Sequence, residues 1–127
     1  MKKPQILVVD DHSAVRAAIE LILEDDYQIV QAVDAEEGWR VLHSKQLALV
    51  ITDHSMPGRM NGLDMAVKLQ QEHSLVPLIL MSAEDDVADL ARSYGIADFL
   101  PKPFDIETLQ AKVKDKIGAG ACAKNIH

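Results

Sequence analysis

The stretch Leu47-Ala48-Leu49-Val50-Ile51-Thr52-Asp53 decides the fold of this chain. An apolar run without alternation is typical of a strand buried on both faces of a parallel sheet, and this run ends on a carboxylate. Two further apolar runs end in the same way, one on Asp10-Asp11 and one on Ser82. Ligands of open α/β sheets bind at the edge where the strands end, so the sequence predicts a site there.

The composition limits the possible classes of protein. A chain of 127 residues that is 48% hydrophobic predicts one domain with one core. The formal net charge of −7 argues against direct binding to nucleic acid or to an anionic membrane surface. Cys122 is the only cysteine, which excludes an intrachain disulfide and favours a reducing compartment, so we expect a cytoplasmic protein. No stretch approaches the ~18 apolar residues of a membrane helix.

Helical and strand-like patterns alternate along the chain, which predicts an α/β domain with a parallel sheet and right-handed crossovers. The first helix is predicted to begin with Asp11 or Ser13 as its cap. The domain is predicted to span 4–118, with a disordered tail over 119–127. The predicted strands are 6–9, 27–33, 47–52, 76–81 and 98–100, and the predicted helices are 13–24, 34 onward, 63–72, 84–94 and 105–117.

The last two helices carry the clearest end signals. Gly95 is placed to end the fourth helix in a left-handed conformation. Asp105 is placed to cap the fifth, with Phe104 and Leu109 spaced as a hydrophobic staple across its start. We expect the buried stripe of the fifth helix to consist of Ile106, Leu109, Val113 and Ile117.

The acidic strand ends predict a metal site. Asp10, Asp11 and Asp53 would repel one another at a shared edge unless a cation lies between them. Mg²⁺ fits this set, because it binds through one or two carboxylates together with water and phosphate oxygens. His12 and His54 flank the acids, and we interpret both as solvated loop residues rather than ligands.

Two further polar residues complete the predicted site. Lys102 follows the fifth strand and Ser82 ends the fourth. A metal, an ammonium, a hydroxyl and a carboxylate nucleophile are the groups needed for phosphoryl transfer to aspartate. Any one of these residues alone is more simply a solvated surface residue, but four strand ends with matching chemistry favour the site.

Five short motifs follow one another along the chain, namely Val8-Val9-Asp10-Asp11, Ile51-Thr52-Asp53 with Met56-Pro57, Asn61-Gly62, Leu80-Met81-Ser82-Ala83 and Asp98-Phe99-Leu100-Pro101-Lys102-Pro103-Phe104. With these motifs in this order, the sequence closely resembles the receiver domain of two-component response regulators from Gln5 to Ile117. The resemblance implies a flavodoxin-like five-stranded parallel sheet with strand order 2-1-3-4-5 and five flanking helices.

The resemblance also implies roles for the acidic residues. Asp53 resembles the phosphoacceptor, and Asp10 and Asp11 resemble the pair that holds Mg²⁺ with Asp53. Ser55 would add its backbone carbonyl to the metal. The donor would be a phosphohistidine on a sensor histidine kinase or a histidine phosphotransfer protein, and the output protein or fused effector is unknown.

The remaining implied roles concern the switch. Ser82 resembles the hydroxyl that moves to the phosphoryl group, and Phe99 resembles the aromatic residue that follows it. Lys102 would pair with a phosphoryl oxygen, and the bond from Lys102 to Pro103 is expected to be cis. The loop 57–62 carries one residue more than the commonest family form. The segment from Ser82 to Lys102 is two residues shorter than usual, so we expect a short or displaced fourth helix.

Two other interpretations remain open, a phosphatase and a binding module, and a third, a flavodoxin-type cofactor binder, fails on the sequence. A Mg²⁺-dependent phosphatase with an aspartate nucleophile would show Asp-x-Asp, whereas Asp10 and Asp11 are adjacent. A flavodoxin-type cofactor binder would need a phosphate loop rich in Ser, Thr and Gly after the first strand. The chain could also be a non-phosphorylated binding module of receiver fold. No output segment is recognisable after Ile117, which leaves open a stand-alone receiver or part of a longer regulator or hybrid kinase.

Overall fold

Five strands form one parallel sheet in the order β2-β1-β3-β4-β5, as the resemblance implied. The computed structural model describes residues 3–56, 58, 60–72, 74–96 and 98–118. The strands are β1 Gln5–Val9, β2 Gln28–Ala32, β3 Leu49–Asp53, β4 Leu78–Ser82 and β5 Phe99–Pro101. The predicted tail at 119–127, with Cys122, lies outside the described residues.

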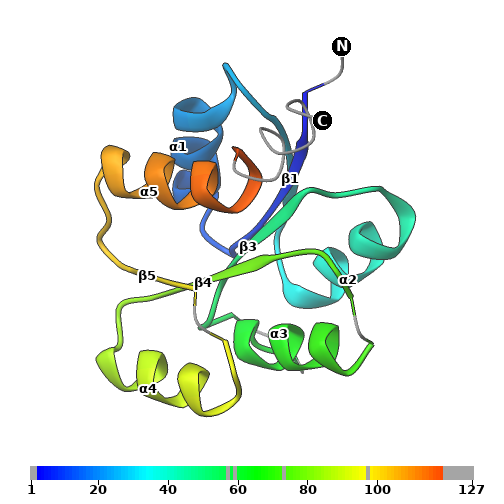
Figure 1. Cartoon of the computed structure of the whole chain (residues 1–127), viewed down its shortest axis with the longest axis vertical. Coiled ribbons are helices and arrows are strands. Elements are labelled where there is room, and N and C mark those ends of the chain that lie inside the picture. The colour runs from blue at the N-terminus through cyan, green and yellow to red at the C-terminus, as the bar shows by residue number, and fades with distance from the viewer. Residues whose placement is uncertain (1–2, 57, 59, 73, 97, 119–127) are drawn as a thin grey trace.

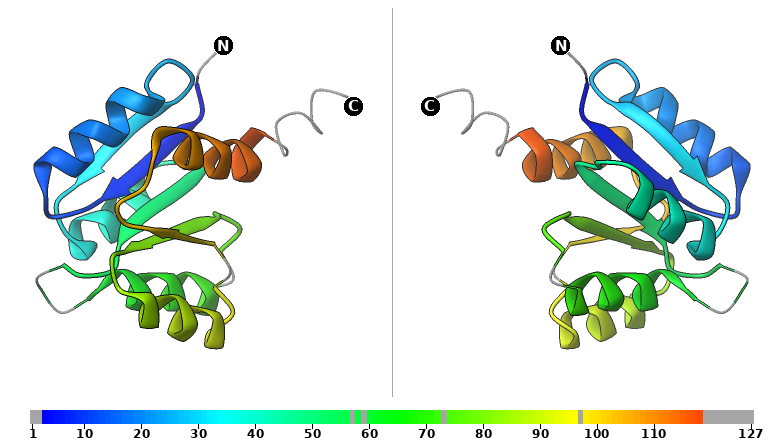
Figure 2. Two further views of the ribbon diagram at one scale, coloured as in Figure 1. Left: turned by 90° about the vertical axis from the view of Figure 1, so that its left-hand side faces the viewer. Right: turned by 90° about the vertical axis from the view of Figure 1, so that its right-hand side faces the viewer.

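The helices cover both faces of the sheet. They are α1 Ser13–Leu23, α2 Ala35–Ser44, α3 Gly62–Gln71, α4 Asp85–Ser93 and α5 Ile106–Val113, which continues as a π-helical turn, η1, over Lys114–Gly118. Helices α1 and α5 lie on one face, and α2, α3 and α4 lie on the other (Figures 1 and 2). Within the described residues, no helix has the length and apolarity needed to cross a membrane.

The central strands have apolar side chains on both faces because both faces are covered. In β1, Ile6 and Val8 pack with α1 and α5, whereas Leu7 and Val9 pack with the cluster under α2 and α3. Every residue of β3 is buried. This double coverage explains why these strands lack alternation, as predicted.

Two of the end signals are confirmed, and the staple stays a prediction. Asp105 caps α5 by accepting the amide of Thr108 at 2.6 Å, which also lowers the pKa of its carboxyl group. Helix α4 has nine residues and is followed by Gly95 in the left-handed region at φ +82°. Phe104 is partly buried and packs against the core cluster that contains Leu109, which is compatible with the predicted staple.

Two local predictions are wrong. Neither Asp11 nor Ser13 caps α1: the N-cap is His12, and among the described residues its side chain makes no capping hydrogen bond. Ser13 is already the first helical residue, and the acidic side chains before it are directed to other partners. Ile106 is 56% exposed rather than part of the buried stripe, because Phe104 packs on the core at this end of α5.

Candidate functional site

The carboxyl ends of β1, β3, β4 and β5 meet at one edge of the sheet, where they place the predicted polar residues. Asp10 follows β1, Asp53 and Ser82 are the last residues of β3 and β4, and Lys102 follows β5. Strand pairing sets Val9 beside Thr52, Asp53 beside Met81 and Ser82 beside Pro101, so the four strand ends are level. Asp10, Asp53 and Ser82 are each at least 96% buried, which is rare for such side chains without partners.

Lys102 connects the two buried acids. Its ammonium Nζ lies 2.9 Å from Oδ2 of Asp10 and 2.9 Å from Oδ1 of Asp53. The side chain of Lys102 is 19% exposed, so this bridge is screened only weakly by solvent. The peptide bond between Lys102 and Pro103 is cis, as the resemblance implied. Residues far apart in the sequence are therefore brought together as predicted.

Asp10 and Asp11 form a second cluster with His12. One possible ligand atom from each of the three residues lies within 4.8 Å of the others. Nδ1 of His12 is 3.1 Å from Oδ1 of Asp10 and 3.1 Å from Oδ1 of Asp11. The interpretation of His12 as a purely solvated residue is therefore incomplete: its side chain is 66% exposed, yet it contacts both acids. Its position directly after the acidic pair is the signal that could have indicated this.

His54 also differs from its interpretation as a solvated loop residue. It is half-buried, and its Nδ1 is buried with no hydrogen-bond partner among the described residues. Its backbone carbonyl accepts the amide of Gly62 at 3.1 Å, which closes the loop after β3. A Cβ at position 62 would overlap the carbonyl oxygen of Asp53. Gly62 therefore lets this loop pack directly on the backbone of Asp53, a role that the sequence pattern alone did not indicate.

The charges at this edge affect one another strongly. Burial raises the pKa of the Asp53 carboxyl group above its ordinary value, Lys102 lowers it, and Asp10 and Asp11 raise it further, with a net increase. Burial lowers the pKa of Lys102, but its hydrogen bonds and ion pairs with Asp53 and Asp10 outweigh burial and raise it. The ammonium therefore stays charged, while ionised Asp53 is incompletely compensated. An additional cation would favour the ionised carboxylate.

The donor set fits Mg²⁺. Asp10, Asp11 and Asp53 supply carboxylate oxygens, the ligands that this hard cation prefers. Asp10 and Asp11 offer them within one small cluster, and Asp53 is connected to Asp10 through the ammonium of Lys102. Ser55 lies exposed in the loop two residues after Asp53, and the role of its carbonyl stays a prediction.

Ser82 and Phe99 lie on the side of the site that leads to α4. Oγ of Ser82 accepts the amide of Glu84 at 3.0 Å, and its carbonyl accepts the amide of Lys102 at 2.8 Å. Glu84 is the residue that precedes α4. Phe99 is partly buried against the apolar cluster between α3 and α4, where it contacts core rather than the acids. Both side chains are thus placed beside the same helix.

The comparisons with known proteins agree on one family. A family model described as "Response regulator receiver domain" matches residues 6–114. The chain is 35% identical over 114 residues to the uncharacterized transcriptional regulatory protein YcbL of Bacillus subtilis, covering 88% of this chain and 50% of that protein. It is 34% identical over 113 residues to the response regulator ArlR of Staphylococcus aureus, covering 87% and 51%.

A solved structure shows the same fold. The chemotaxis protein CheY4 of Vibrio cholerae superposes with a TM-score of 0.78 at 25% identity, covering 90% of this chain and 98% of CheY4. The chain spans about half the length of the two curated relatives named above.

Proposed function

The chain belongs to the response regulator receiver domain family, and from this premise we propose that Asp53 accepts a phosphoryl group from a phosphohistidine of a partner protein, with Mg²⁺ bound beside it. The observation that carries the proposal is the ammonium of Lys102, which binds the buried carboxylates of Asp10 and Asp53 together. A buried carboxylate beside a fixed cation is suited to receive a strongly anionic group.

In the proposed reaction an oxygen of the Asp53 carboxylate forms a bond to phosphorus. The N–P bond of the phosphohistidine breaks, and its electron pair stays on the imidazole nitrogen of the partner. Lys102 already binds one oxygen of Asp53 and is placed to hold the charge that arrives. Bound at Asp10, Asp11 and Asp53, Mg²⁺ would neutralise charge on the acids and on the phosphoryl oxygens.

The proposed switch starts at Ser82. Its hydroxyl now accepts from the amide of Glu84, and its proton is available to a phosphoryl oxygen on Asp53. Turning towards the phosphoryl group would release Glu84 and shift the population of positions of α4 and Phe99. The shift can be no larger than the difference in affinity of the phosphoryl group for the two arrangements.

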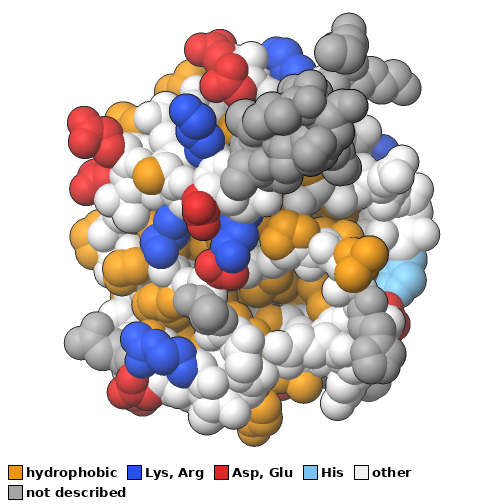
Figure 3. Space-filling model, viewed as in Figure 1, with side chains coloured by type: hydrophobic (Ala, Val, Ile, Leu, Met, Phe, Trp, Pro, Cys, Tyr) orange, Lys and Arg blue, Asp and Glu red, His pale blue; other side chains and the backbone are white. Residues whose placement is uncertain are grey.

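The proposal also covers the phosphoryl donor and the cellular compartment of the chain. Receiver domains of response regulators work with histidine kinases, and the kinase or histidine phosphotransfer protein is the proposed donor here. The face shown in Figure 3 mixes acidic and basic side chains, with no continuous basic surface on the part that is described. The net charge of −7 argues against direct binding to nucleic acid, and this part of the proposal stays a prediction. We expect it to act in the cytoplasm through protein contacts.

Intact mass after incubation with MgCl₂ and acetyl phosphate tests the proposal. The wild-type chain is expected to gain one phosphoryl group, and Asp53→Asn is expected to gain none. Chelation of Mg²⁺ should prevent the gain in the wild type. Equal labelling of the variant, or an unchanged mass of the wild type, would remove the proposed role of Asp53. Repeated turnover of a generic phosphate ester would instead favour a phosphatase.

A further inference from the structure

Arg16 of α1 binds the backbone beside the proposed metal site. Its Nη1 donates to the carbonyl oxygen of Asp10 at 2.6 Å, and its Nε donates to Oε1 of Gln31 at 2.9 Å. The side-chain nitrogen of Gln31 in turn donates to Oε1 of Glu20 at 2.5 Å. A row of hydrogen bonds therefore runs from the solvent-exposed edge strand β2, through α1, to the end of β1.

This row completes the set of partners around Asp10. The amide of Asp10 donates to the carbonyl of Ala32 at 3.1 Å, and Oδ1 accepts the amide of His12 at 2.9 Å. Oδ2 accepts from Lys102, and the carbonyl oxygen accepts from Arg16. Each polar atom of this fully buried residue thus has a partner from a different part of the chain.

The carbonyl of Asp10 belongs to the planar peptide unit that leads directly to Asp11. A fixed position of this oxygen sets the direction in which the chain enters Asp11, and so affects both members of the acidic pair. The guanidinium is well suited to this task, because its planar fork binds Asp10 and Gln31 in one orientation. A lysine would reach one acceptor without fixing the plane.

We propose that Arg16, held in place by Gln31, is a positioning residue for the divalent cation site of Asp10 and Asp11. The inference rests on the proposed function, since it takes Mg²⁺ to bind at these acids. Partners that orient the ligands of a metal are often needed for its affinity. Gln31 acts indirectly, because it holds Arg16 and lies on β2, a strand that contributes no proposed metal ligand.

A purely electrostatic effect of Arg16 predicts the opposite sign. Its positive charge lies close to Asp10 and Asp11, so removal of that charge alone would strengthen Mg²⁺ binding. Loss of positioning would weaken the binding. The two explanations also differ at Gln31, because substitution of this neutral residue changes no charge.

Amide chemical shifts of the ¹⁵N-labelled chain during titration with MgCl₂ give the Mg²⁺ dissociation constant and report on folding. Gln31→Ala is the decisive variant, and Gln28→Ala is its matched control. Gln28 is exposed on the same strand, and over the described residues its side chain shows no hydrogen bond. We expect the dissociation constant to rise about threefold in Gln31→Ala and about tenfold in Arg16→Lys, while Gln28→Ala matches the wild type.

Arg16→Gln separates charge from position. Weaker Mg²⁺ binding in this variant supports positioning, and tighter binding overturns it. An unchanged dissociation constant in Gln31→Ala with wild-type spectra elsewhere also overturns the inference, while leaving the proposed function intact. A wild-type chain that shows no Mg²⁺-dependent shifts overturns both. If substitutions of Arg16 unfold the chain, the comparison of Gln31→Ala with Gln28→Ala still decides.

Discussion

The ends of β1 and β4 lie at the same edge of the sheet, but the rest of the molecule holds them differently. Asp10, at the end of β1, has a partner for each polar atom, and one of these partners is the charged Lys102. The hydroxyl of Ser82, at the end of β4, accepts one neutral hydrogen bond from Glu84. Hydrogen bonds to charged groups are the stronger kind. The proposed metal side is thus fixed, and the proposed switch side is held weakly.

The helices repeat this difference. Leu109 and Val113 of α5 are fully buried in the large cluster that spans all of one face of the sheet. Helix α4 packs through Val87 and Ala91 on a smaller cluster and leaves Leu90 47% exposed. A helix with fewer buried contacts opens at lower free energy. The molecule therefore places the less anchored of these two helices next to the residue proposed to move.

The largest expected effect comes from Lys102→Met, which removes the ammonium that bridges Asp10 and Asp53 on the proposed metal side. Asp10 and Asp53 would stay buried without their shared ammonium, so we expect the free energy of unfolding at pH 7 in EDTA to fall by about 3 kcal/mol. Lys102 lowers the already raised pKa of Asp53, so without the lysine this pKa would rise further above its value in the unfolded chain. The variant should therefore regain stability as the pH falls from 7 to 5.

Urea unfolding of Lys102→Met at both pH values measures this effect. Lys114→Met, at an exposed position, is the control and should match the wild type. Added MgCl₂ should restore part of the stability of Lys102→Met. A variant as stable as the wild type at pH 7 would show that the bridge does not hold the acids.

A pair of identical substitutions compares the two helices directly. We expect Val113→Ala in α5 to lower the free energy of unfolding by about 2 kcal/mol and Val87→Ala in α4 by about 1 kcal/mol, because the cavity under α4 can collapse more easily. Denaturant unfolding gives both values. Hydrogen exchange should be faster in α4 than in α5 already in the wild type. Equal losses and equal exchange would contradict the contrast between the helices.

Ser82→Ala tests the weakly held side. Loss of Oγ leaves the amide of Glu84 without its acceptor, with an expected loss of about 1 kcal/mol in the free energy of unfolding. Labelling of Asp53 should continue, but the amide shifts of α4 on phosphorylation should shrink. Ser93→Ala, at the other end of α4, is the control. Unchanged α4 shifts in Ser82→Ala would exclude the serine as the switch.

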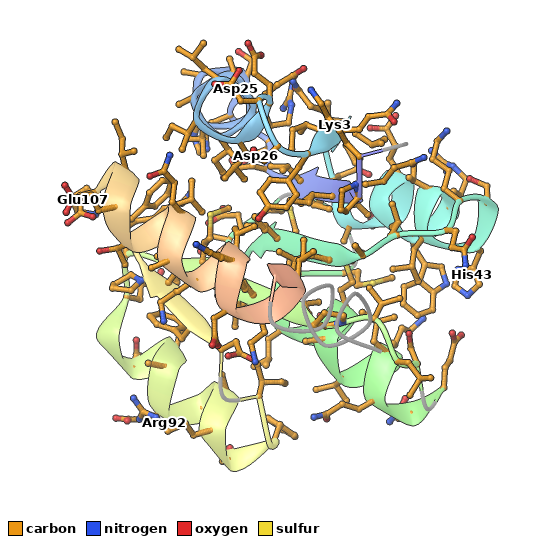
Figure 4. The ribbon with its side chains drawn as sticks, turned by 45° about the horizontal axis from the view of Figure 1, so that its top comes forward. Lys3, Asp25, Asp26, His43, Arg92 and Glu107 are labelled. Atoms are coloured by element: carbon orange, nitrogen blue, oxygen red, sulfur yellow. The ribbon has the colours of Figure 1, made fainter. Side chains whose placement is uncertain are left out.

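The smallest expected effect lies outside the site, at His43, which points outward from α2 in Figure 4. Nδ1 of His43 lies 2.9 Å from the carbonyl of Trp39, and Nε2 lies 3.2 Å from Glu72. Both neighbours are acceptors, so only the doubly protonated ring satisfies both. The hydrogen bond to Trp39 raises the pKa of His43, burial lowers it, and Glu72 raises it further, with a net increase.

Because the folded-state pKa of His43 is raised, its contribution to stability is complete below the unfolded pKa of about 6.5 and is lost as the pH rises through the raised value. Since the pair of His43 and Glu72 is exposed to solvent, we expect its contribution to the free energy of unfolding to be about 0.3 kcal/mol. Urea unfolding of the wild type and His43→Gln between pH 5 and pH 8 measures the difference. Phosphorylation of Asp53 should be the same in His43→Gln and in the wild type. A stability difference between the two proteins that is the same at every pH would contradict the assignment.

The sheet and the central residues of the site were predictable because both depend on strand ends. Uninterrupted apolar runs indicate buried parallel strands, and the polar residues that close them must share an edge, which brings Asp10, Asp53, Ser82 and Lys102 together. Residues that end neighbouring parallel strands lie at the same edge of the sheet whatever the direction of their side chains. The strand order came from the family resemblance rather than from these patterns.

The errors concern single side chains whose surroundings come from distant parts of the sequence. Ser13 has the right chemistry for a cap, but the helix starts one residue too early for it to act as one. Ile106 has the right spacing for the core, but Phe104 packs there. The contacts of Arg16 with Asp10 and Gln31 require a knowledge of which strand lies beside α1. Such contacts follow from the fold and leave no local pattern.

The close approach of Gly62 to the backbone of Asp53 has a consequence for diversification within the family. With the loop after β3 closed by the hydrogen bond between His54 and Gly62, the chain between them can lengthen without displacing the aspartate beneath. Exchange of the intervening loop is therefore expected to leave the reactivity of Asp53 towards acetyl phosphate intact, which would allow this loop to vary independently of the proposed chemistry.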